Sequence, residues 1–297
     1  MERQTKADLM LLVIAIFWGF SYLLTKVGLE GLEPFNLTAL RFIIAFIISA
    51  IIFRKKLEIN KGTIKHSFIL GILLFSMFVT MAFGLEHTTA SNAGFLISLA
   101  VVLIPIFSSI FLKDKIERRV IIGVILAFVG IALLSLDTEL KINTGDLFCL
   151  LCAVVSAAHV IVVGIFTQES EPITLGVLQL GFAGLLSIIF SFFTETVRLP
   201  STKTTWFSVL TLSIFCTAIS YIVQTTAQQH TTATHTGLIF STEPVFSAIF
   251  SYIFLNEVLE PRAYLGAFIL MCGVLTAEVD FKKLIKKDEE EKFTVEG

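Results

Sequence analysis

The sequence predicts an all-α integral membrane protein with ten transmembrane helices, arranged as two inverted five-helix repeats. Three observations predict this class. The chain of 297 residues is 55% hydrophobic and only 15% charged, whereas soluble domains carry roughly 25% charged residues. Apolar stretches long enough to cross a bilayer recur along the whole chain. The second half of the sequence also repeats the first at a fixed spacing, which is typical of membrane proteins built from duplicated units.

Ten apolar stretches account for nearly the whole chain. Each is close to the roughly 20 residues with which a helix crosses about 30 Å of hydrocarbon. Because a membrane interior offers the backbone no hydrogen-bond partners, each stretch is expected to be helical. The first is too long for the apolar core of a signal peptide and lacks a small-residue cleavage site, so we expect it to be retained. The expected spans are 8–27, 34–53, 64–84, 90–112, 119–136, 146–167, 172–194, 205–227, 233–255 and 262–279.

The repeat is clearest at His87-Thr88-Thr89-Ala90, which recurs as His230-Thr231-Thr232-Ala233 at an offset of 143 residues. The first parts of the repeats correspond at an offset of 138, where Asp8-Leu9 matches Asp146-Leu147. Each repeat contains an odd number of spans, so the second enters the membrane upside down, and an inverted pair of this kind allows alternating access to a site between the halves. The predicted units are residues 1–140, residues 141–281 and a charged tail at 282–297.

Lys and Arg gather in the connections that lie on one side of this arrangement. Arg54, Lys55 and Lys56 follow the second span, residues 113–119 join the fourth span to the fifth, and the tail after residue 281 is rich in Lys. The positive-inside rule therefore places both termini in the cytoplasm. The expected location is the cell (inner or plasma) membrane.

Several short motifs are shared with one known family. They are Trp18-Gly19, Arg41 after Pro34, Pro105, Glu243-Pro244-Val245-Phe246 and Phe254-Leu255-Asn256-Glu257. With them the chain resembles the drug/metabolite transporter (DMT) superfamily, and within it the ten-helix EamA-type transporters. The resemblance implies a 5+5 inverted-repeat bundle that commonly exports amino acids or other small metabolites. Two departures, Asn256 for the family's usual Gly and Asp114 for a Glu in the first half, lie at helix ends.

Glu243 stands near the middle of an apolar span. A carboxylate there costs roughly 2.5–3.5 kcal/mol on insertion scales, so it must face the interior of the bundle. One interpretation is a site for a substrate amine or a proton. The other is a structural carboxylate that caps the backbone freed by Pro244 or pairs with Arg41. Thr236, Ser247 and Ser251 share its helical stripe.

Other polar side chains within spans mark a predicted cavity. Tyr221 and Gln224 share one face of their span with Thr217 and Gln228, and Arg41 could bind a substrate carboxylate or make an inter-helix pair. His159 titrates near neutral pH when unperturbed, but a lone buried His is more often inert. The predicted substrate-binding residues are Trp18, Tyr22, Arg41, Asn92, His159, Gln179, Tyr221, Gln224 and Glu243.

The sequence lacks the motifs of several other classes. Cys149 and Cys152 have metal-motif spacing, but no second pair completes a site, and there is no phosphate loop or nucleophile with its base. We therefore expect no cofactor, no metal, no nucleic-acid partner and no enzymatic activity. The expected partners are a small-molecule substrate and membrane lipids. Small residues at Gly123, Gly130, Gly266 and Gly273 favour close packing inside the bundle, with a homodimer face as the alternative.

Two other functions remain open at this point. A flippase for lipid-linked sugars or polyprenyl head groups would need a lateral opening to lipid. An intramembrane enzyme or a sensor would need catalytic clusters or an output domain, neither of which the sequence contains.

Overall fold

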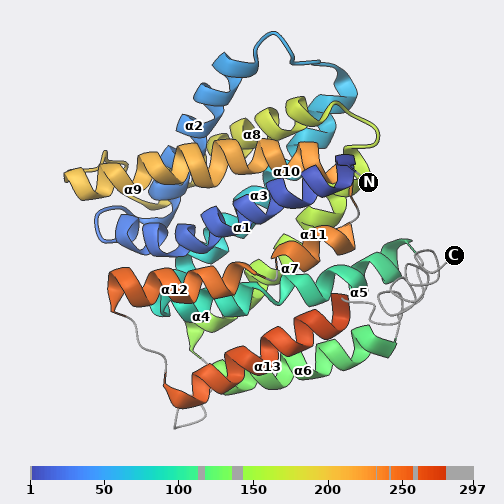
Figure 1. The fold of residues 1–297 in the computed structure, drawn as a ribbon. Coiled ribbons are helices and arrows are strands. Elements are labelled where there is room, and N and C mark those ends of the chain that lie inside the picture. The colour runs from blue at the N-terminus through green and yellow to red at the C-terminus, as the bar shows by residue number, and fades with distance from the viewer. Residues whose placement is uncertain are drawn as a thin grey trace, which may run out of the picture.

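The computed structural model describes residues 2–112, 118–135, 143–231, 233–240, 242–256 and 260–278, and the regular elements in these ranges are all helices (Figure 1). The predicted tail at 282–297 lies outside the described residues. The helices are α1 Glu2–Leu29, α2 Pro34–Phe53, α3 Lys61–His87, α4 Ala90–Ile97, α5 Ala100–Leu112, α6 Arg118–Ser135, α7 Thr144–Phe166, α8 Pro172–Thr194, α9 Lys203–Ser213, the π-helix η1 Ile214–Ile219, α10 Ser220–Gln228, α11 Ala233–Phe240, α12 Glu243–Leu255 and α13 Pro261–Glu278.

The expected spans all coincide with helices, which confirms the all-α membrane class. Within the described residues, seven helical stretches are long and apolar enough to cross a membrane: α1, α2, α3, α4 with α5, α7, α8, and the run from α9 to α10. Shorter apolar stretches lie in α6 and α12. Large apolar side chains point outward along the bundle, among them Phe128, Phe192 and Phe193, as a lipid-facing surface requires.

Local sequence determines where several helices begin. Asn60 and Thr63 exchange two hydrogen bonds across the start of α3, which forms a capping box. Pro34 and Pro172 open α2 and α8, where the missing N–H of proline removes no helical bond. At the end of α12, Asn256 adopts φ 52°, a left-handed conformation that Gly and Asn tolerate best. This explains how Asn256 can replace the Gly that is usual in the family that the chain resembles.

The start of α2 is capped from a distant segment. The carboxylate of Glu195, just after α8, accepts hydrogen bonds from the backbone N–H groups of Phe35 (2.8 Å) and Asn36 (2.7 Å). Burial raises the pKa of Glu195, against the opposing effect of these two amides. The contact joins α2 to α8, the second helix of one repeat to the second helix of the other.

Three spans that we predicted as continuous helices are interrupted, which corrects that expectation. The fourth breaks at residues 98–99, the ninth between Phe240 and Glu243, and the eighth contains η1. The stripe predicted for Thr236, Glu243, Ser247 and Ser251 therefore spans two helices.

The two breaks are equivalent in the repeat. Leu99 N donates to Leu96 O, and 143 residues later Thr242 N donates to Ile239 O. The next bond recurs as well, since Val102 N donates to Leu99 O and Val245 N to Thr242 O. Pro244 corresponds to Val101, so proline is not their common cause.

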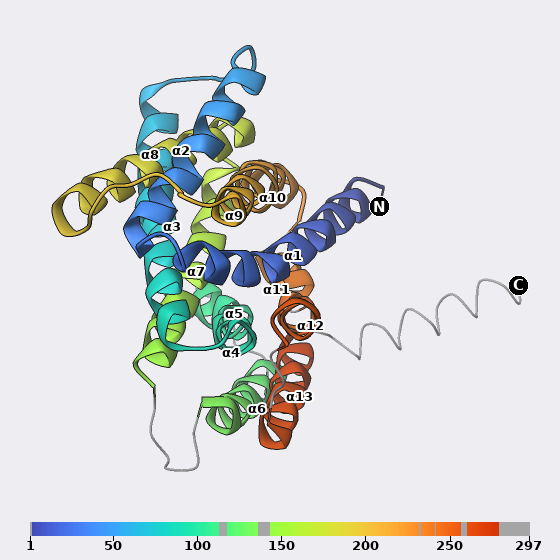
Figure 2. The ribbon, with the colours of Figure 1, turned by 90° about the vertical axis from the view of Figure 1, so that its left-hand side faces the viewer.

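The helices pack with the symmetry that inverted repeats require. α3 packs against α7 and α8, and its counterpart, the run from α9 to α10, packs against α1 and α2. The counterparts α6 and α13 lie side by side in both views (Figures 1 and 2). A Cβ on Gly130 would lie 2.6 Å from Leu270 N, and one on Gly273 would lie 2.7 Å from Ala127 N. These glycines therefore serve packing between two helices of the same chain.

Candidate functional site

A cavity of about 60 Å³ lies between the two repeats, roughly enough for a few water molecules. Its walls come from equivalent positions in the two halves. Phe78 and Tyr221 line it at an offset of 143, as do Met81 and Gln224, and Ile97 and Phe240. Trp18 and Ser156 line it at an offset of 138, as do Ser21 and His159. The cavity therefore lies where the repeats are related to each other.

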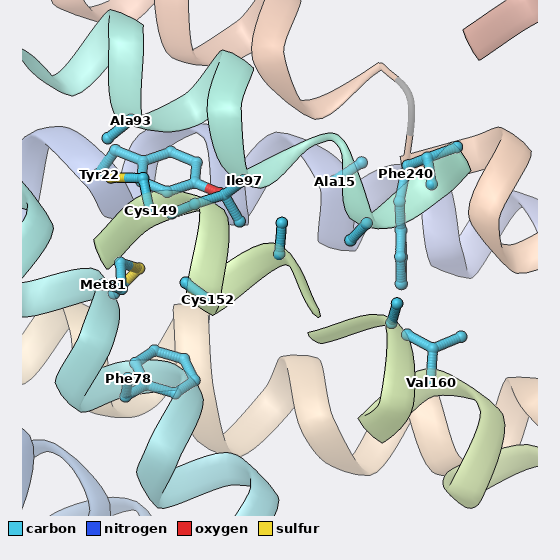
Figure 3. Close-up of a cluster of buried hydrophobic side chains, with 14 of the residues drawn as sticks. Ala15, Tyr22, Phe78, Met81, Ala93, Ile97, Cys149, Cys152, Val160 and Phe240 are labelled. Atoms are coloured by element: carbon cyan, nitrogen blue, oxygen red, sulfur yellow. The ribbon is translucent and has the colours of Figure 1, made fainter. Parts of the chain in front are cut away.

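The structure places most of the predicted residues around this cavity. Those that line it are Trp18, Tyr22, His159, Tyr221, Gln224 and Glu243. Arg41, Asn92 and Gln179 do not line it. Figure 3 shows Tyr22 with other members of the same buried cluster, including Phe78, Met81, Cys152 and Phe240. The break between α11 and α12 brings Phe240 and Glu243 to the wall, and the break between α4 and α5 does the same for Ile97 and Ala100.

Glu243 is the first residue of α12 and accepts a hydrogen bond from the Tyr22 hydroxyl at 2.6 Å. Gly19 permits this contact, because a Cβ there would lie 2.9 Å from Glu243 O and 2.6 Å from the Cβ of Phe246. The ion pairs in the described residues are Arg198–Glu33, His66–Glu169 and Arg262–Glu260. The pairing of Glu243 with Arg41, one of the alternatives from the sequence, is therefore not formed.

Arg41 is buried beside the cavity and holds the π-helix. Its Nε donates to Thr217 Oγ1 and its Nη2 to Cys216 O, at 2.5 and 3.3 Å. The Trp18 indole N–H donates to the same carbonyl at 3.1 Å. A π-helix shifts the backbone bonding pattern and often occurs at functional sites, and here the Cys216 carbonyl receives two side-chain donors. The Arg41 guanidinium also lies over the Phe78 ring at 4.3 Å.

His159, at the cavity wall, pairs with Gln179, which does not line the cavity. The His159 Nε2 atom lies 3.0 Å from Gln179 Oε1, within hydrogen-bond distance. Gln179 Nε2 is buried and has no partner within the described part of the chain. Asn92 lies in the first turn of α4, where its backbone N–H is capped by Thr89 Oγ1, and it is half-buried.

The apolar and small residues of the cavity wall were not among the predicted substrate-binding residues. Phe78, Phe240, Ser98 and Ser156 all line the cavity. The repeat held a signal for some of them, because Phe78 is the counterpart of Tyr221 and Ser156 that of Trp18. Selecting only polar residues within spans left these counterparts out.

Comparisons with known proteins agree with this architecture. The profile of the EamA-like transporter family matches residues 5–136 and again residues 143–277. The chain belongs to the EamA-like transporter family. An uncharacterized transporter of Archaeoglobus fulgidus is 34% identical over 274 residues, which cover 92% of this chain and 86% of the relative. The uncharacterized transporter YoaV of Bacillus subtilis is 23% identical over 289 residues, 94% of this chain and 98% of its own length.

One solved crystal structure of a protein shares the fold, with a TM-score of 0.73 at 18% identity over 94% of this chain and 99% of that chain. This EamA-family protein is thus a multi-pass membrane transporter, and not an enzyme. Its substrate class and mechanism do not follow from the family.

The two ends of the transporter differ at equivalent positions. At the Thr88 end, where α3 ends and α7 begins, the repeats are in contact. Thr88 Oγ1 donates to Asp146 Oδ1 at 3.2 Å, and a Cβ on Gly145 would lie 2.8 Å from Gly84 O. Phe83 packs on Phe148 with ring centroids 5.7 Å apart.

At the Thr231 end, where α10 ends and α1 begins, the corresponding contacts are absent from the described residues. Asp8 Oδ1 and Thr231 Oγ1, the counterparts of Asp146 and Thr88, are both buried without a hydrogen-bond partner there. A pocket of about 230 Å³ separates the two helices. Each residue that lines this pocket corresponds, through the repeat, to a residue that forms or adjoins the Thr88–Asp146 contact at the other end. The lining residues are Lys6, Ala7, Met10, Thr226, Ala227 and His230.

Proposed function

We propose that this chain is a secondary transporter of small organic metabolites that works by alternating access around the cavity between its repeats. One observation carries the proposal: the Thr88–Asp146 contact is made, and the equivalent contact between Thr231 and Asp8 is open. Two inverted units of related sequence can have two packings of similar energy, each closing the opposite end. The conformation described here is closed at the Thr88 end.

The exchange between the two packings follows from the same contacts. In the opposite conformation Asp8 accepts from Thr231, the gap beside Ala7 and Ala227 closes, and the Thr88–Asp146 bond is broken. The cavity between the repeats is then reached from the Thr88 end. The breaks at residues 98–99 and before Glu243 lie at the cavity wall in both repeats, where a change of helix direction moves one half of a span and leaves the other packed.

The proposed orientation puts the Thr231 end in the cytoplasm of a cell-membrane protein, together with both termini. The supporting observation is the excess of Lys and Arg in the connections on that side, including Arg54, Lys55 and Lys56. Tags at residues 1 and 297 are then both protected from impermeant reagents in intact cells. A tag at either terminus that reacts from outside contradicts this orientation.

The test of transport is uptake and efflux of a panel of labelled metabolites in proteoliposomes. The panel contains amines, amino acids, carboxylates and neutral solutes, and each is measured with and without a pH gradient. At least one class is expected to cross faster than in protein-free liposomes and to show counterflow, which requires a carrier with a single alternating site. A protein that carries no class contradicts the proposal, as does one that conducts all classes without saturation.

A further inference from the structure

The cavity wall combines aromatic rings with hydrogen-bond acceptors. Trp18 packs against Tyr221 and Phe240 with ring centroids 5.3 and 4.8 Å apart, and Phe78 packs on Tyr221 at 6.0 Å. Aromatic faces carry partial negative charge and attract cations as well as apolar groups. The rings therefore suit a ligand with an apolar body, a positive charge, or both.

Among the described residues that line the cavity, Glu243 is the one acidic side chain, and none is Lys or Arg. Its Oε1 atom accepts the Tyr22 hydroxyl hydrogen, a neutral donor that leaves a charged carboxylate without a counter-ion at this wall. Burying an unpaired carboxylate is costly, so a ligand that brings a positive charge gains from this arrangement. A ligand that brings a negative charge is repelled.

Gln224 adds a second acceptor whose orientation is fixed by its neighbours. Gln228 Nε2 donates to Val160 O at 3.1 Å, so Gln228 Oε1 is directed the other way and accepts from Gln224 Nε2 at 2.9 Å. Gln224 Oε1 is consequently left as a free acceptor. It is fully buried, has no partner in the described residues, and belongs to a side chain that lines the cavity.

We infer that the transported solute is an organic amine in its cationic form, bound with its ammonium group between the Glu243 carboxylate and Gln224 Oε1. This inference rests on the proposed transport function. The ammonium N–H groups supply the donors that the two acceptors lack. The apolar part of the solute packs on Trp18, Tyr221 and Phe240 once these rings move apart, because the cavity of about 60 Å³ in this conformation is smaller than such a solute.

The position of Arg41 separates an amine from an amino acid. A zwitterion needs a cationic partner for its carboxylate, and Arg41 is a buried cation in contact with the cavity residues Ser21 and Phe78. Its guanidinium bonds to Thr217, Ser21 and the Cys216 carbonyl behind the Phe78 ring, and it is not among the cavity residues. A substrate carboxylate would therefore lie in an acceptor-rich cavity without a partner.

The test uses three probes of matched shape with purified full-length protein in detergent: phenethylamine, phenylalanine and 3-phenylpropionate. Binding is measured by isothermal titration calorimetry. We expect phenethylamine to bind at least 10-fold more tightly than either of the others. Equal or tighter binding of phenylalanine or phenylpropionate overturns the inference.

Variants locate the binding. Glu243→Gln is expected to weaken phenethylamine binding about 10- to 100-fold, because a hydrogen bond to a charged group contributes about 1.5–3 kcal/mol. Gln224→Leu is expected to weaken it several-fold, and Glu243→Asp to retain part of the affinity. Glu86→Gln makes the same exchange at an exposed carboxylate outside the cavity and is the matched control, expected to leave binding unchanged. If both Glu243→Gln and Gln224→Leu elute as monodisperse protein and bind like the parent, the inference fails.

The proteoliposome panel distinguishes failure of this inference from failure of transport. Saturable transport of amino acids or carboxylates without transport of amines leaves the carrier function standing and overturns the amine site. Transport of phenethylamine that is lost in Glu243→Gln and kept in Glu86→Gln supports both.

Discussion

At the residue scale, Glu243 at the cavity wall and the buried Arg41 are stabilised by neutral groups and not by each other. Tyr22 bonds to Glu243, while Thr217, Ser21 and a backbone carbonyl bond to Arg41. A buried ion pair would hold both side chains in one geometry and resist a change of conformation. With separate neutral partners, Glu243 lies at the cavity wall without a bond to Arg41, as the proposed amine site requires, while Arg41 bonds to the π-helix.

Because Trp18 and Arg41 both donate to the Cys216 carbonyl, we expect their effects on stability to be coupled. Trp18→Phe removes one of these donors and Arg41→Met removes the other. Each single change leaves one side-chain donor, whereas the double change leaves this buried carbonyl with none, and loss of the donors to a buried acceptor costs about 1–3 kcal/mol. We expect the double variant to lose about 1 kcal/mol more than the two single losses combined. Thermal unfolding in detergent measures the cycle, and additive losses would show that the carbonyl is satisfied in another way.

At the element scale, the positions of the helices could be predicted from hydropathy, but their interruptions could not. Hydropathy gives 90–112 and 233–255 each as one span, because the polar residues at the two breaks interrupt the apolar character of either stretch for only a few positions. The breaks occur at the same place in both repeats, although the proline after the break is present only in the second, so proline is not their shared signal. The π-helix depends on Trp18 and Arg41 from other helices.

Close packing of α6 on α13 gives a prediction at the same scale. Gly130→Ala and Gly273→Ala each place a Cβ within 2.6 or 2.7 Å of a backbone nitrogen of the other helix, so the helices must separate. Each is expected to destabilise the protein by about 1–3 kcal/mol, by similar amounts because the two sites are equivalent. The readout is the thermal unfolding midpoint in detergent.

Gly164→Ala is the matched control for these two changes. Gly164 also lies within a helix, α7, but a Cβ there meets nothing within 4 Å. Alanine is favoured over glycine in a helix by about 1 kcal/mol, so this variant is expected to be neutral or slightly more stable. Equal losses at all three glycines would show that the close approach of α6 and α13 is not responsible.

At the scale of the whole molecule, the repeat predicted the architecture and where the cavity lies, but not which end is closed. Two inverted units with corresponding residues, such as Thr88 with Thr231 and Asp146 with Asp8, allow both packings. Small differences in free energy between the two packings determine which end is closed, and a sequence pattern does not show such differences. The partner of Gln179 could not be predicted from the repeat either. Gln179 is at the position equivalent to Arg41, but it bonds to His159.

The two equivalent threonines therefore have opposite predicted effects on the conformational equilibrium. Thr88→Val removes a bond made in the conformation described here, and Thr231→Val removes the bond that the proposed opposite conformation would make. One hydrogen bond contributes about 1 kcal/mol, so each change shifts the ratio of the two conformations about 5-fold.

The measurement uses a reporter cysteine at the cavity wall, which reacts with an impermeant maleimide added at the Thr88 side. The reporter is Ser156→Cys in a background without Cys149, Cys152, Cys216 and Cys272. We expect Thr88→Val to speed this reaction and Thr231→Val to slow it. Thr194→Val removes a bond within one helix and is expected to change nothing, while shifts in the same direction for Thr88→Val and Thr231→Val would rule out an exchange between the two contacts.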